Sequence, residues 1–209
     1  MALAKWQALV PIKQGTDGKS RLAGVLDCRA RAALIGRMAQ HVLAVLGQCE
    51  AIERITLLSP HRPDGWLGDW RRDGGRGLNP ELAAWRQGLG GAPALVFHAD
   101  LPLAKPEDVG ALLAMADKRR VAMATDRAGL GTNALAIADG APFEFCFGPM
   151  SRMLHTAQFP DMPVVRRAGL TIDIDTPDDL RFAETCGFGP ESAASWNGSM
   201  PTPRLRNMA

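Results

Sequence analysis

The stretch Ala94-Leu-Val-Phe-His-Ala-Asp100-Leu-Pro-Leu103 is an apolar run of strand length that ends in one carboxylate. Because the Leu-Pro pair after Asp100 cannot easily continue a helix or a central strand, the run predicts a buried strand with Asp100 at its carboxyl end. In open α/β sheets, ligands bind in the crevice beyond the carboxyl ends of the strands. Asp100 is therefore a candidate ligand for a metal that accompanies a phosphorylated substrate, although an Asp that caps the next turn would give the same pattern.

The composition is typical of a globular protein, with 46% hydrophobic and 22% charged residues among 209. A chain of this length buries one substantial core, so we expect one domain. The formal net charge of +2 argues against a protein that binds nucleic acid mainly by neutralising phosphates. The N-terminus lacks the pattern of a signal peptide and no apolar run reaches membrane-spanning length, so we expect a cytoplasmic protein without a membrane partner. The cysteines show no metal-ligand spacing and are expected to be reduced thiols: Cys28, Cys49, Cys146 and Cys186.

A basic loop that contains glycines separates the first predicted strand, residues 6–12, from a long helical pattern that begins near Arg29. The loop extends from Lys13 to Leu22 and includes Lys19 and Arg21. Glycines let a backbone curl round a phosphate with its N–H groups pointing inward, and cations supply the charge. The loop could thus bind a triphosphate, but it lacks the Walker A spacing, and a solvated basic loop fits about as well.

The remaining segments predict an alternation of strands and helices. Further strands are expected over residues 54–59, 121–125, 143–147, 164–166 and 170–174, and residues 134–138 form another apolar run. Helices are expected from Asn79-Pro80, with Asn79 as N-cap, over residues 106–116, after Ser151, and from Thr176 to near Gly187. Residues 60–77 show no periodicity, which predicts a long loop anchored by Trp66 and Trp70.

A second glycine-rich loop covers residues 126–133 and contains Thr132 and Asn133. It offers N–H groups, a hydroxyl and an amide to an anionic ligand, though a plain hairpin turn would look similar. Further along, Ser151 either caps its helix or joins exposed N–H groups in holding a phosphate. For His155 on the same helix, a satisfied structural role is the commoner one.

Two acids, Asp173 and Asp175, are two residues apart in a predicted strand, so the pleat points both side chains to one face. Like charges side by side cost energy unless a cation compensates, which indicates a divalent metal or a neighbouring Lys or Arg. The next residues form a capping signature, with Thr176 as N-cap and acids in the first turn. Asp178 and Asp179 are therefore expected to be structural.

Seven motifs follow one another along the chain: Val10-Pro-Ile-Lys13, Lys19-Ser-Arg-Leu22, Gly77-Leu-Asn-Pro-Glu-Leu82, Ala99-Asp-Leu-Pro-Leu103, Gly129-Leu-Gly-Thr-Asn-Ala-Leu135, Phe147-Gly-Pro-Met-Ser151 and Asp173-Ile-Asp-Thr-Pro-Asp-Asp-Leu180. Together they resemble the 2-phospho-L-lactate guanylyltransferase family, whose members make the activated phospho-acid used in coenzyme F-420 biosynthesis. The last motif alone occurs across many nucleotidyltransferases, so the combination carries the resemblance.

The resemblance implies an α/β fold: a single-domain, three-layer nucleotidyltransferase fold with a mixed, mostly parallel central sheet. This fold is shared with nucleotide-diphospho-sugar transferases and molybdenum-cofactor nucleotidyltransferases. Because the motifs extend from Trp6 to Gly187, we expect a nucleotidyltransferase domain over residues 1–187. Residues 188–209 are rich in Gly, Pro, Ser and Asn and are expected to be a disordered tail.

The resemblance also implies a Mg²⁺-dependent enzyme that transfers GMP from GTP to a small phospho-acid and releases pyrophosphate. By their match to the motifs, the nucleotide phosphates would be bound by Lys13, Lys19 and Arg21, and Asn79 is a weaker candidate for a nucleotide contact. Asp100 and Asp173 match the metal-binding acids of the family, with Asp175 nearby. The expected catalytic residues are Lys19, Asp100 and Asp173.

For the phospho-acid, the matching positions are Thr132, Gly148 and Ser151, with Asn133 beside them. Members of the family use 2-phospho-L-lactate, phosphoenolpyruvate or 3-phospho-D-glycerate, and one sequence does not decide among substrates that differ so little. Two alternatives stay open: another Mg²⁺-dependent nucleotidyltransferase, with a molybdopterin or sugar-phosphate acceptor, or a non-catalytic nucleotide-binding protein. A homodimer is a reasonable expectation.

Overall fold

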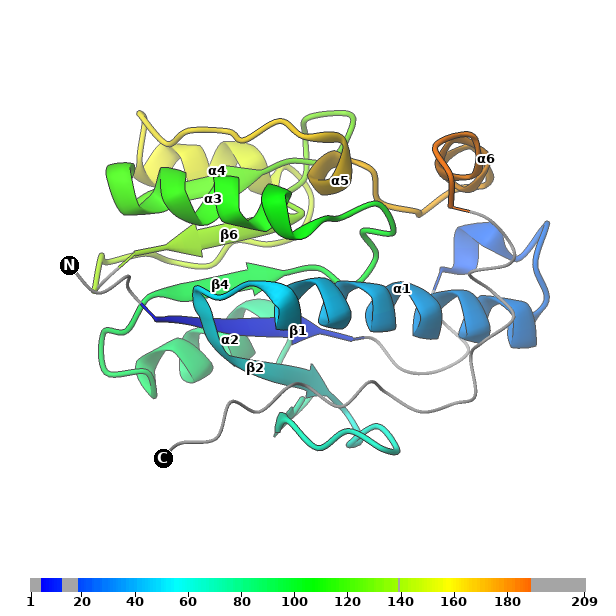
Figure 1. Ribbon diagram of the computed structural model, residues 1–209, viewed down its shortest axis with the longest axis horizontal. Coiled ribbons are helices and arrows are strands. Elements are labelled where there is room, and N and C mark those ends of the chain that lie inside the picture. Colours follow the sequence, from blue (N-terminus) through cyan, green and yellow to red (C-terminus); the bar gives the residue numbers. More distant parts are fainter. Residues whose placement is uncertain (1–4, 13–18, 139, 189–209) are drawn as a thin grey trace.

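The structure is a computed structural model that describes residues 5–12, 19–138 and 140–188. Within these residues, a six-stranded sheet has the strand order β3-β2-β1-β4-β6-β5 (Figure 1). Its strands are β1 (Trp6–Pro11), β2 (Ile52–Ser59), β3 (Asp69–Arg72), β4 (Ala94–Phe97), β5 (Val121–Ala124) and β6 (Ala134–Ile137). Strand β6 runs antiparallel to both of its neighbours, and the other pairs are parallel. The sheet is thus mixed and mostly parallel, as the sequence motifs predicted.

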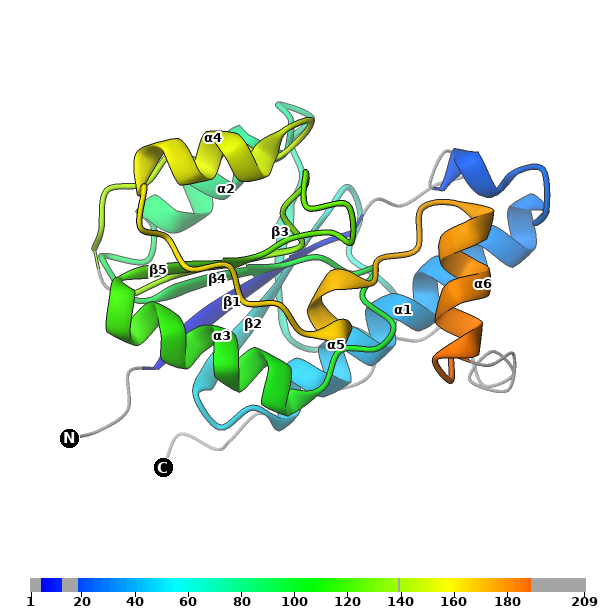
Figure 2. The same ribbon diagram turned by 90° about the horizontal axis from the view of Figure 1, so that it is seen from above.

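Helices cover both faces of the sheet and complete a three-layer α/β fold (Figure 2). The elements are η1 (Ser20–Leu22), α1 (Cys28–Gln48), α2 (Leu78–Gln87), α3 (Pro106–Arg119), α4 (Ser151–Gln158), α5 (Ala168–Thr171) and α6 (Pro177–Thr185). Helices α1 and α3 lie on one face, and α2 and α4 lie on the other. Helix α6 lies beside η1 and the start of α1, at one end of the sheet.

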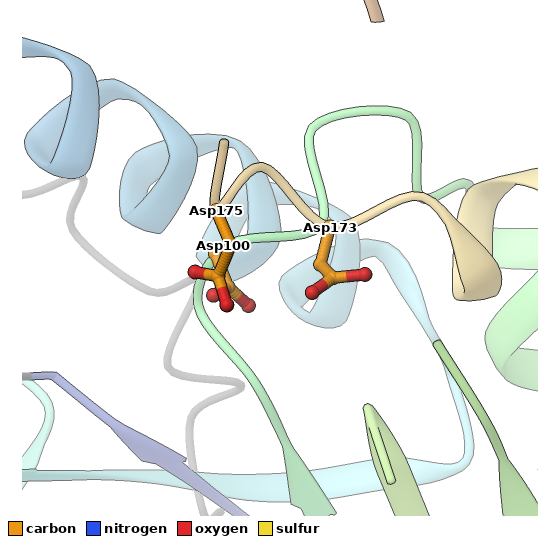
Figure 3. Close-up of side chains that lie close together, drawn as sticks. All are labelled: Asp100, Asp173 and Asp175. Atoms are coloured by element: carbon orange, nitrogen blue, oxygen red, sulfur yellow. The ribbon is translucent and has the colours of Figure 1, made fainter. Parts of the chain in front are cut away.

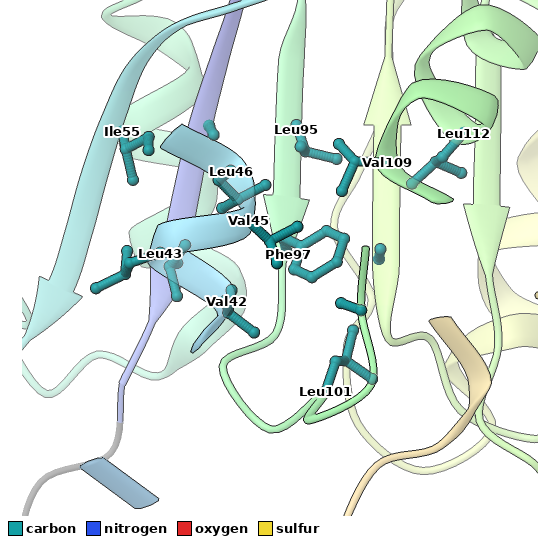
Figure 4. Packing of buried hydrophobic residues seen from close by; sticks show 14 of the residues in the cluster. Val42, Leu43, Val45, Leu46, Ile55, Leu95, Phe97, Leu101, Val109 and Leu112 are labelled. Carbon is teal, nitrogen blue, oxygen red and sulfur yellow. The ribbon is translucent and has the colours of Figure 1, made fainter. Parts of the chain in front are cut away.

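The core has one hydrophobic layer on each side of the sheet. Helix α1 buries an apolar stripe at helical spacing that includes Leu34, Met38, Val42 and Leu46. Part of this stripe packs with Phe97 of β4 on the α1/α3 face (Figure 4). The other layer joins the sheet to α2 and to the chain between residues 141 and 147. Burial on both faces explains why β4 is apolar throughout, as the opening stretch predicted.

Most of the predicted elements are confirmed. The first strand, the long helix after Arg29, and the strands and helix between residues 94 and 138 are present with boundaries shifted by a few residues. Thr176 caps α6: its hydroxyl accepts a hydrogen bond from the Asp179 N–H, and the Asp179 carboxylate accepts one from the Thr176 N–H. Trp66 and Trp70 anchor their segment, through ring N–H groups that donate to Asp69 O and Ser59 Oγ.

Two predictions around residues 60–79 were wrong. The segment is not a continuous loop, because Asp69–Arg72 pairs with β2 as the parallel edge strand β3. Asn79 is not an N-cap, since α2 begins at Leu78 after Gly77, whose φ of 96° only glycine adopts readily. The Asn79 side chain instead hydrogen-bonds the backbone of Phe147.

Three predicted strands in the last third of the chain are absent from the described residues. Residues 143–147 lie outside the sheet, because side chains rather than a strand bond their backbone. Of residues 164–166, only Val164 makes a bridge, to Met123. In the segment 170–174, Leu170 and Thr171 belong to the short helix α5, and residues 172–174 have no strand pairing.

The predicted tail began at residue 188, but Phe188 is 7% exposed and packs with Leu22, Leu34 and Ile174 in a third hydrophobic cluster. Residues 189–209 lie outside the described part of the chain. All four cysteines are free thiols. Among the described helices, none combines the length and the apolar character that crossing a membrane requires.

Candidate active site

Three carboxylates meet beyond the carboxyl end of β4. Asp100, Asp173 and Asp175 each offer an oxygen, and these oxygens lie within 4.8 Å of one another. Figure 3 shows the three carboxylate groups on the same side of the chain segments that carry them. The backbone brings the segments together, because the Ile174 N–H donates to the Asp100 carbonyl at 3.3 Å. The prediction that Asp173 and Asp175 share one side is confirmed, although an extended segment outside the sheet places them there.

Lys19 is the cation that compensates this cluster. Its Nζ lies 2.5 Å from Asp100 Oδ2 and 2.6 Å from Asp175 Oδ1, and its side chain is 11% exposed. Burial by itself would lower the pKa of the ammonium, but Asp100 and Asp175 more than offset this and raise the pKa. Lys19 therefore remains charged at neutral pH. Its backbone adopts the left-handed conformation, with a φ of 56°, which is uncommon for a residue with a side chain.

The carboxylates of the cluster differ in acidity. Burial raises the pKa of Asp173 to about 6, and Asp100 and Asp175 add to the rise by repulsion. Burial also acts to raise the pKa of Asp100, but the adjacent Lys19 ammonium outweighs it and lowers that pKa. The amide of Asn133 donates to Asp173 Oδ1 at 3.4 Å and to the Leu170 carbonyl at 3.1 Å. Asn133 thus connects the second glycine-rich loop to the acid cluster.

The acid cluster has the chemistry of a site for a hard divalent cation such as Mg²⁺. All of its candidate ligands are carboxylate oxygens, which Mg²⁺ prefers. Among the described residues, the buried Asp100 Oδ1 has no hydrogen-bond partner, and such an orphaned oxygen is costly unless a ligand satisfies it. The two ion pairs of Lys19 are with Asp100 and Asp175, so a bound cation would complete the charge compensation at Asp173. These residues therefore fit a Mg²⁺ ion.

A second group of polar side chains is buried between the 126–133 loop and α4. Thr132 Oγ1 lies 3.1 Å from Ser151 Oγ and 3.0 Å from His155 Nδ1. Thr132, Ser151 and His155 are 3%, 1% and 0% exposed. Next to them, the Ser151 N–H donates to the carbonyl of Gly148, whose φ is 131°. The structure therefore brings together the three residues expected to form the phospho-acid pocket, and it adds His155.

Asn79 contacts the same region rather than Lys19 or the acid cluster. Its side-chain amide donates to the Phe147 carbonyl at 3.0 Å, and its side-chain oxygen accepts from the Phe147 N–H at 2.8 Å. Arg21 is exposed on η1, two residues from Lys19. Lys13 lies outside the described residues. Asp179 bonds the backbone of Thr176 and pairs with Arg127, in keeping with a structural role.

Sequence reasoning gave His155 only a structural role and did not connect it with Thr132 and Ser151, which it had named. The spacing of Ser151 and His155 by four residues, which places both on one face of α4, was the available signal. His98 was also missed; it lies two residues before Asp100 and contributes to the lowering of the Asp100 pKa.

The fold is that of nucleotidyltransferases. A protein from Desulfovibrio desulfuricans G20 assigned to the nucleotide-diphospho-sugar transferases matches with a TM-score of 0.64 at 17% identity, over 86% of each chain. A 4-diphosphocytidyl-2C-methyl-D-erythritol synthase matches with a TM-score of 0.55 at 14% identity, over 87% of this chain and 97% of the other. At these identities the likeness concerns the fold alone.

Residues 6–187 match the model of the family described as "Guanylyl transferase CofC like", and the chain belongs to this family. Two relatives of similar length are named phosphoenolpyruvate guanylyltransferase. The protein of Sphaerobacter thermophilus is 34% identical over 90% of this chain and 96% of its own. The protein of Nocardia farcinica is 33% identical over 90% of this chain and 88% of its own.

Proposed function

We propose that this protein transfers GMP from GTP to the phosphate of a small phospho-acid and releases pyrophosphate. The observation that carries the proposal is the cluster of Asp100, Asp173 and Asp175 with Lys19, linked through Asn133 to the polar group around Thr132. Acids and a cation without a nucleophilic triad suit a direct transfer between two phosphates. The names of the curated relatives favour phosphoenolpyruvate as the acceptor, and the proposed pathway is coenzyme F-420 biosynthesis in the cytoplasm.

In the proposed reaction, an oxygen of the acceptor's phosphate attacks the α-phosphorus of GTP. A new P–O bond forms as the bond to the β-phosphate oxygen breaks, and pyrophosphate leaves from the opposite side with the bonding electron pair. The attacking phosphate is already an anion, so no general base is needed. The task of the protein is to bring two polyanions together in line.

The side chains around the cluster supply the charge that this task requires. Lys19 is held among the carboxylates and Arg21 is exposed on η1, and both would bind the nucleotide phosphates, together with Lys13 as the family motif implies. Asp100 and Asp173, with Asp175, would hold Mg²⁺, which supplies charge neutralisation on the phosphates when bound. The acceptor would be bound by Thr132, Gly148 and Ser151, with Asn133 oriented between them and the acids.

The first test is pyrophosphate release from GTP and Mg²⁺ with phosphoenolpyruvate, 2-phospho-L-lactate or 3-phospho-D-glycerate, and with ATP and CTP as control nucleotides. We expect release with GTP and one preferred acid. Folded protein that releases no pyrophosphate with any acid would contradict the proposal, and a sugar phosphate or molybdopterin acceptor would then be tested. Size-exclusion chromatography with light scattering would test the expected homodimer.

Replacing Asp173 with Asn should lower the rate of GMP transfer by roughly a thousandfold or more, because it removes a charge that binds the metal. The fold should be retained, since an amide of equal size occupies the same half-buried position. Asp178→Asn is the matched control, because Asp178 is an exposed residue of α6 that pairs with Arg181. Activity near the wild-type level in Asp173→Asn would refute the assignment of this residue.

A further inference from the structure

The chain between residues 141 and 147, which we call the strap, crosses the α2/α4 side of the sheet without joining it. Side chains from the two helices bond its backbone instead. Arg86 of α2 donates to the carbonyls of Ala141 and Phe143. Gln158 of α4 bonds both the N–H and the carbonyl of Glu144 at 2.8 Å.

The end of the strap nearest Gly148 is held at consecutive residues. The Cys146 N–H donates to His155 Nε2 at 2.9 Å, and Asn79 bonds both backbone groups of Phe147. Gly148 follows immediately. The position of this end of the strap therefore depends on His155 and Asn79 rather than on a neighbouring strand.

The contacts of His155 fix its protonation. A backbone N–H can only donate, so Nε2 must accept from Cys146 and carries no proton. Burial lowers the pKa of His155 to about 4, so the ring is neutral near pH 7 and its single proton is on Nδ1. Nδ1 then donates to Thr132 Oγ1 at 3.0 Å.

This donor pattern determines what Thr132 can do. Its hydroxyl oxygen accepts from His155 Nδ1 and from the Ser151 hydroxyl, so both acceptor positions are used. The Thr132 proton is left for a third oxygen. An oxygen of an anionic acceptor at Gly148 and Ser151 is the partner that this geometry suits.

We propose that His155 is a positioning residue for the acceptor: it orients the Thr132 hydroxyl as a donor and holds the strap so that Gly148 faces the same ligand. The inference rests on the proposed function, because it concerns the same phospho-acid. It predicts that His155 controls the affinity for the acceptor and not the affinity for GTP.

Two substitutions separate the hydrogen bond of His155 Nδ1 from that of Nε2. In His155→Asn, the amide nitrogen lies near the former Nδ1 and still donates to Thr132, whereas in His155→Gln the amide lies near the former Nε2 and bonds only Cys146. We expect His155→Gln to raise the KM for the phospho-acid roughly five- to tenfold, with the KM for GTP unchanged. His155→Asn should recover part of this loss.

Gln158→Ala is the matched control, since Gln158 bonds the backbone of the strap at Glu144 and contacts Cys146 at its sulfur rather than at its backbone. It should leave both KM values as in the wild type. Equal rises of the two KM values in His155→Gln would overturn the inference, as would an acceptor KM that stays at the wild-type value or a His155→Asn variant no better than His155→Gln. Wild-type protein inactive with every acid would instead count against the proposed function, so the two failures are distinguishable.

A measurement on the wild-type protein keeps the test independent of variant folding. Nitrogen NMR of labelled histidine should show the His155 proton on Nδ1, and its signal should shift when the phospho-acid is added but not when GTP is added alone. A proton on Nε2, or a His155 signal that does not shift when the phospho-acid is added, would refute the inference.

Discussion

Lys19 shows how a single residue can be held in a strained conformation by what its side chain contacts. Three non-glycine residues in the described part of the chain have positive φ, and two of them, Lys19 and Met150, immediately precede η1 and α4 beside the candidate site. Left-handed backbone costs energy for such residues and persists only where the surroundings fix it. For Lys19, the ion pairs with Asp100 and Asp175 are those surroundings.

Replacing Lys19 with Met should make stability depend on a divalent cation. Without metal, the free energy of unfolding of the variant should be lower by about 1–3 kcal/mol. The loss is smaller than for a fully buried ion pair, because Asp175 is half exposed. Mg²⁺ should then raise the melting temperature of Lys19→Met more than that of the wild type. Thermal unfolding in EDTA and in Mg²⁺ measures both effects, and an equal shift in the two proteins would contradict the prediction.

His155 should make the folded protein sensitive to acid. Its pKa is about 4 in the folded state and about 6.5 when unfolded, so the unfolded chain binds more protons between these values and stability falls as pH falls. The full loss in the free energy of unfolding from His155 is about 3 kcal/mol, and it is reached near pH 4. Asp173 acts in the opposite direction, since its pKa is raised to about 6, so the wild type must be compared with a variant.

The comparison uses urea unfolding of wild type and His155→Gln between pH 7 and 4.5. The wild type should lose more stability over this range, because only it contains the buried imidazole. The same pH dependence in both proteins would show that His155 does not titrate as expected.

At the scale of elements, the strap explains why a strand was predicted and none formed. Phe143, Phe145 and Phe147 alternate with polar residues, as in a half-buried strand, and their rings do pack in the core layer below α2. An alternating pattern predicts which side chains are buried, but it does not predict which groups the backbone hydrogen-bonds. Here Arg86, Asn79, His155 and Gln158 satisfy the backbone groups that a neighbouring strand would have bonded.

Asn79→Ala should therefore loosen the strap. Both backbone groups of Phe147 lose their partner, so we expect a loss of about 1–3 kcal/mol in the free energy of unfolding. The KM for the phospho-acid should rise while the KM for GTP is unchanged. Gln7→Ala, which removes an exposed hydrogen bond to Glu53, serves as control. A rise confined to the KM for GTP would instead favour the nucleotide contact that the family motif suggests for Asn79.

At the scale of the whole molecule, the strand order places the site. The chain winds outward from β1 through β2 to β3, and β4 lies on the opposite side of β1, so the order reverses between β1 and β4. Crevices at such reversals are where open α/β sheets bind ligands. The segments that follow β1 and β4 carry Lys19 and Asp100, and the extended segment after α5 adds Asp173 and Asp175.

Phe97→Ala tests how far the site depends on this core. The ring of this β4 residue is fully buried in the core layer that α1 and α3 cover. Its loss should therefore lower the free energy of unfolding by about 3–5 kcal/mol. Because Phe97 lies three residues before Asp100, transfer activity should fall as well. Leu67→Ala, at a residue 63% exposed, should change neither quantity. Denaturant unfolding and the pyrophosphate assay give both readouts, and an unchanged midpoint in Phe97→Ala would contradict the packing argument.

The sequence by itself determined the elements whose signals are local: the buried strand before Asp100, the long amphipathic helix α1, the capping box at Thr176, and the motifs of the family. It also singled out Asp100, Asp173 and Asp175, because acids in or after apolar segments are recognisable without knowledge of contacts, and the family motifs added Lys19. Only the tertiary structure decided that Lys19 pairs with acids 81 and 156 residues away, and that Asn79 and His155 hold the strap. Local patterns fix which groups need partners, and the partners themselves come from chain segments that only folding brings together.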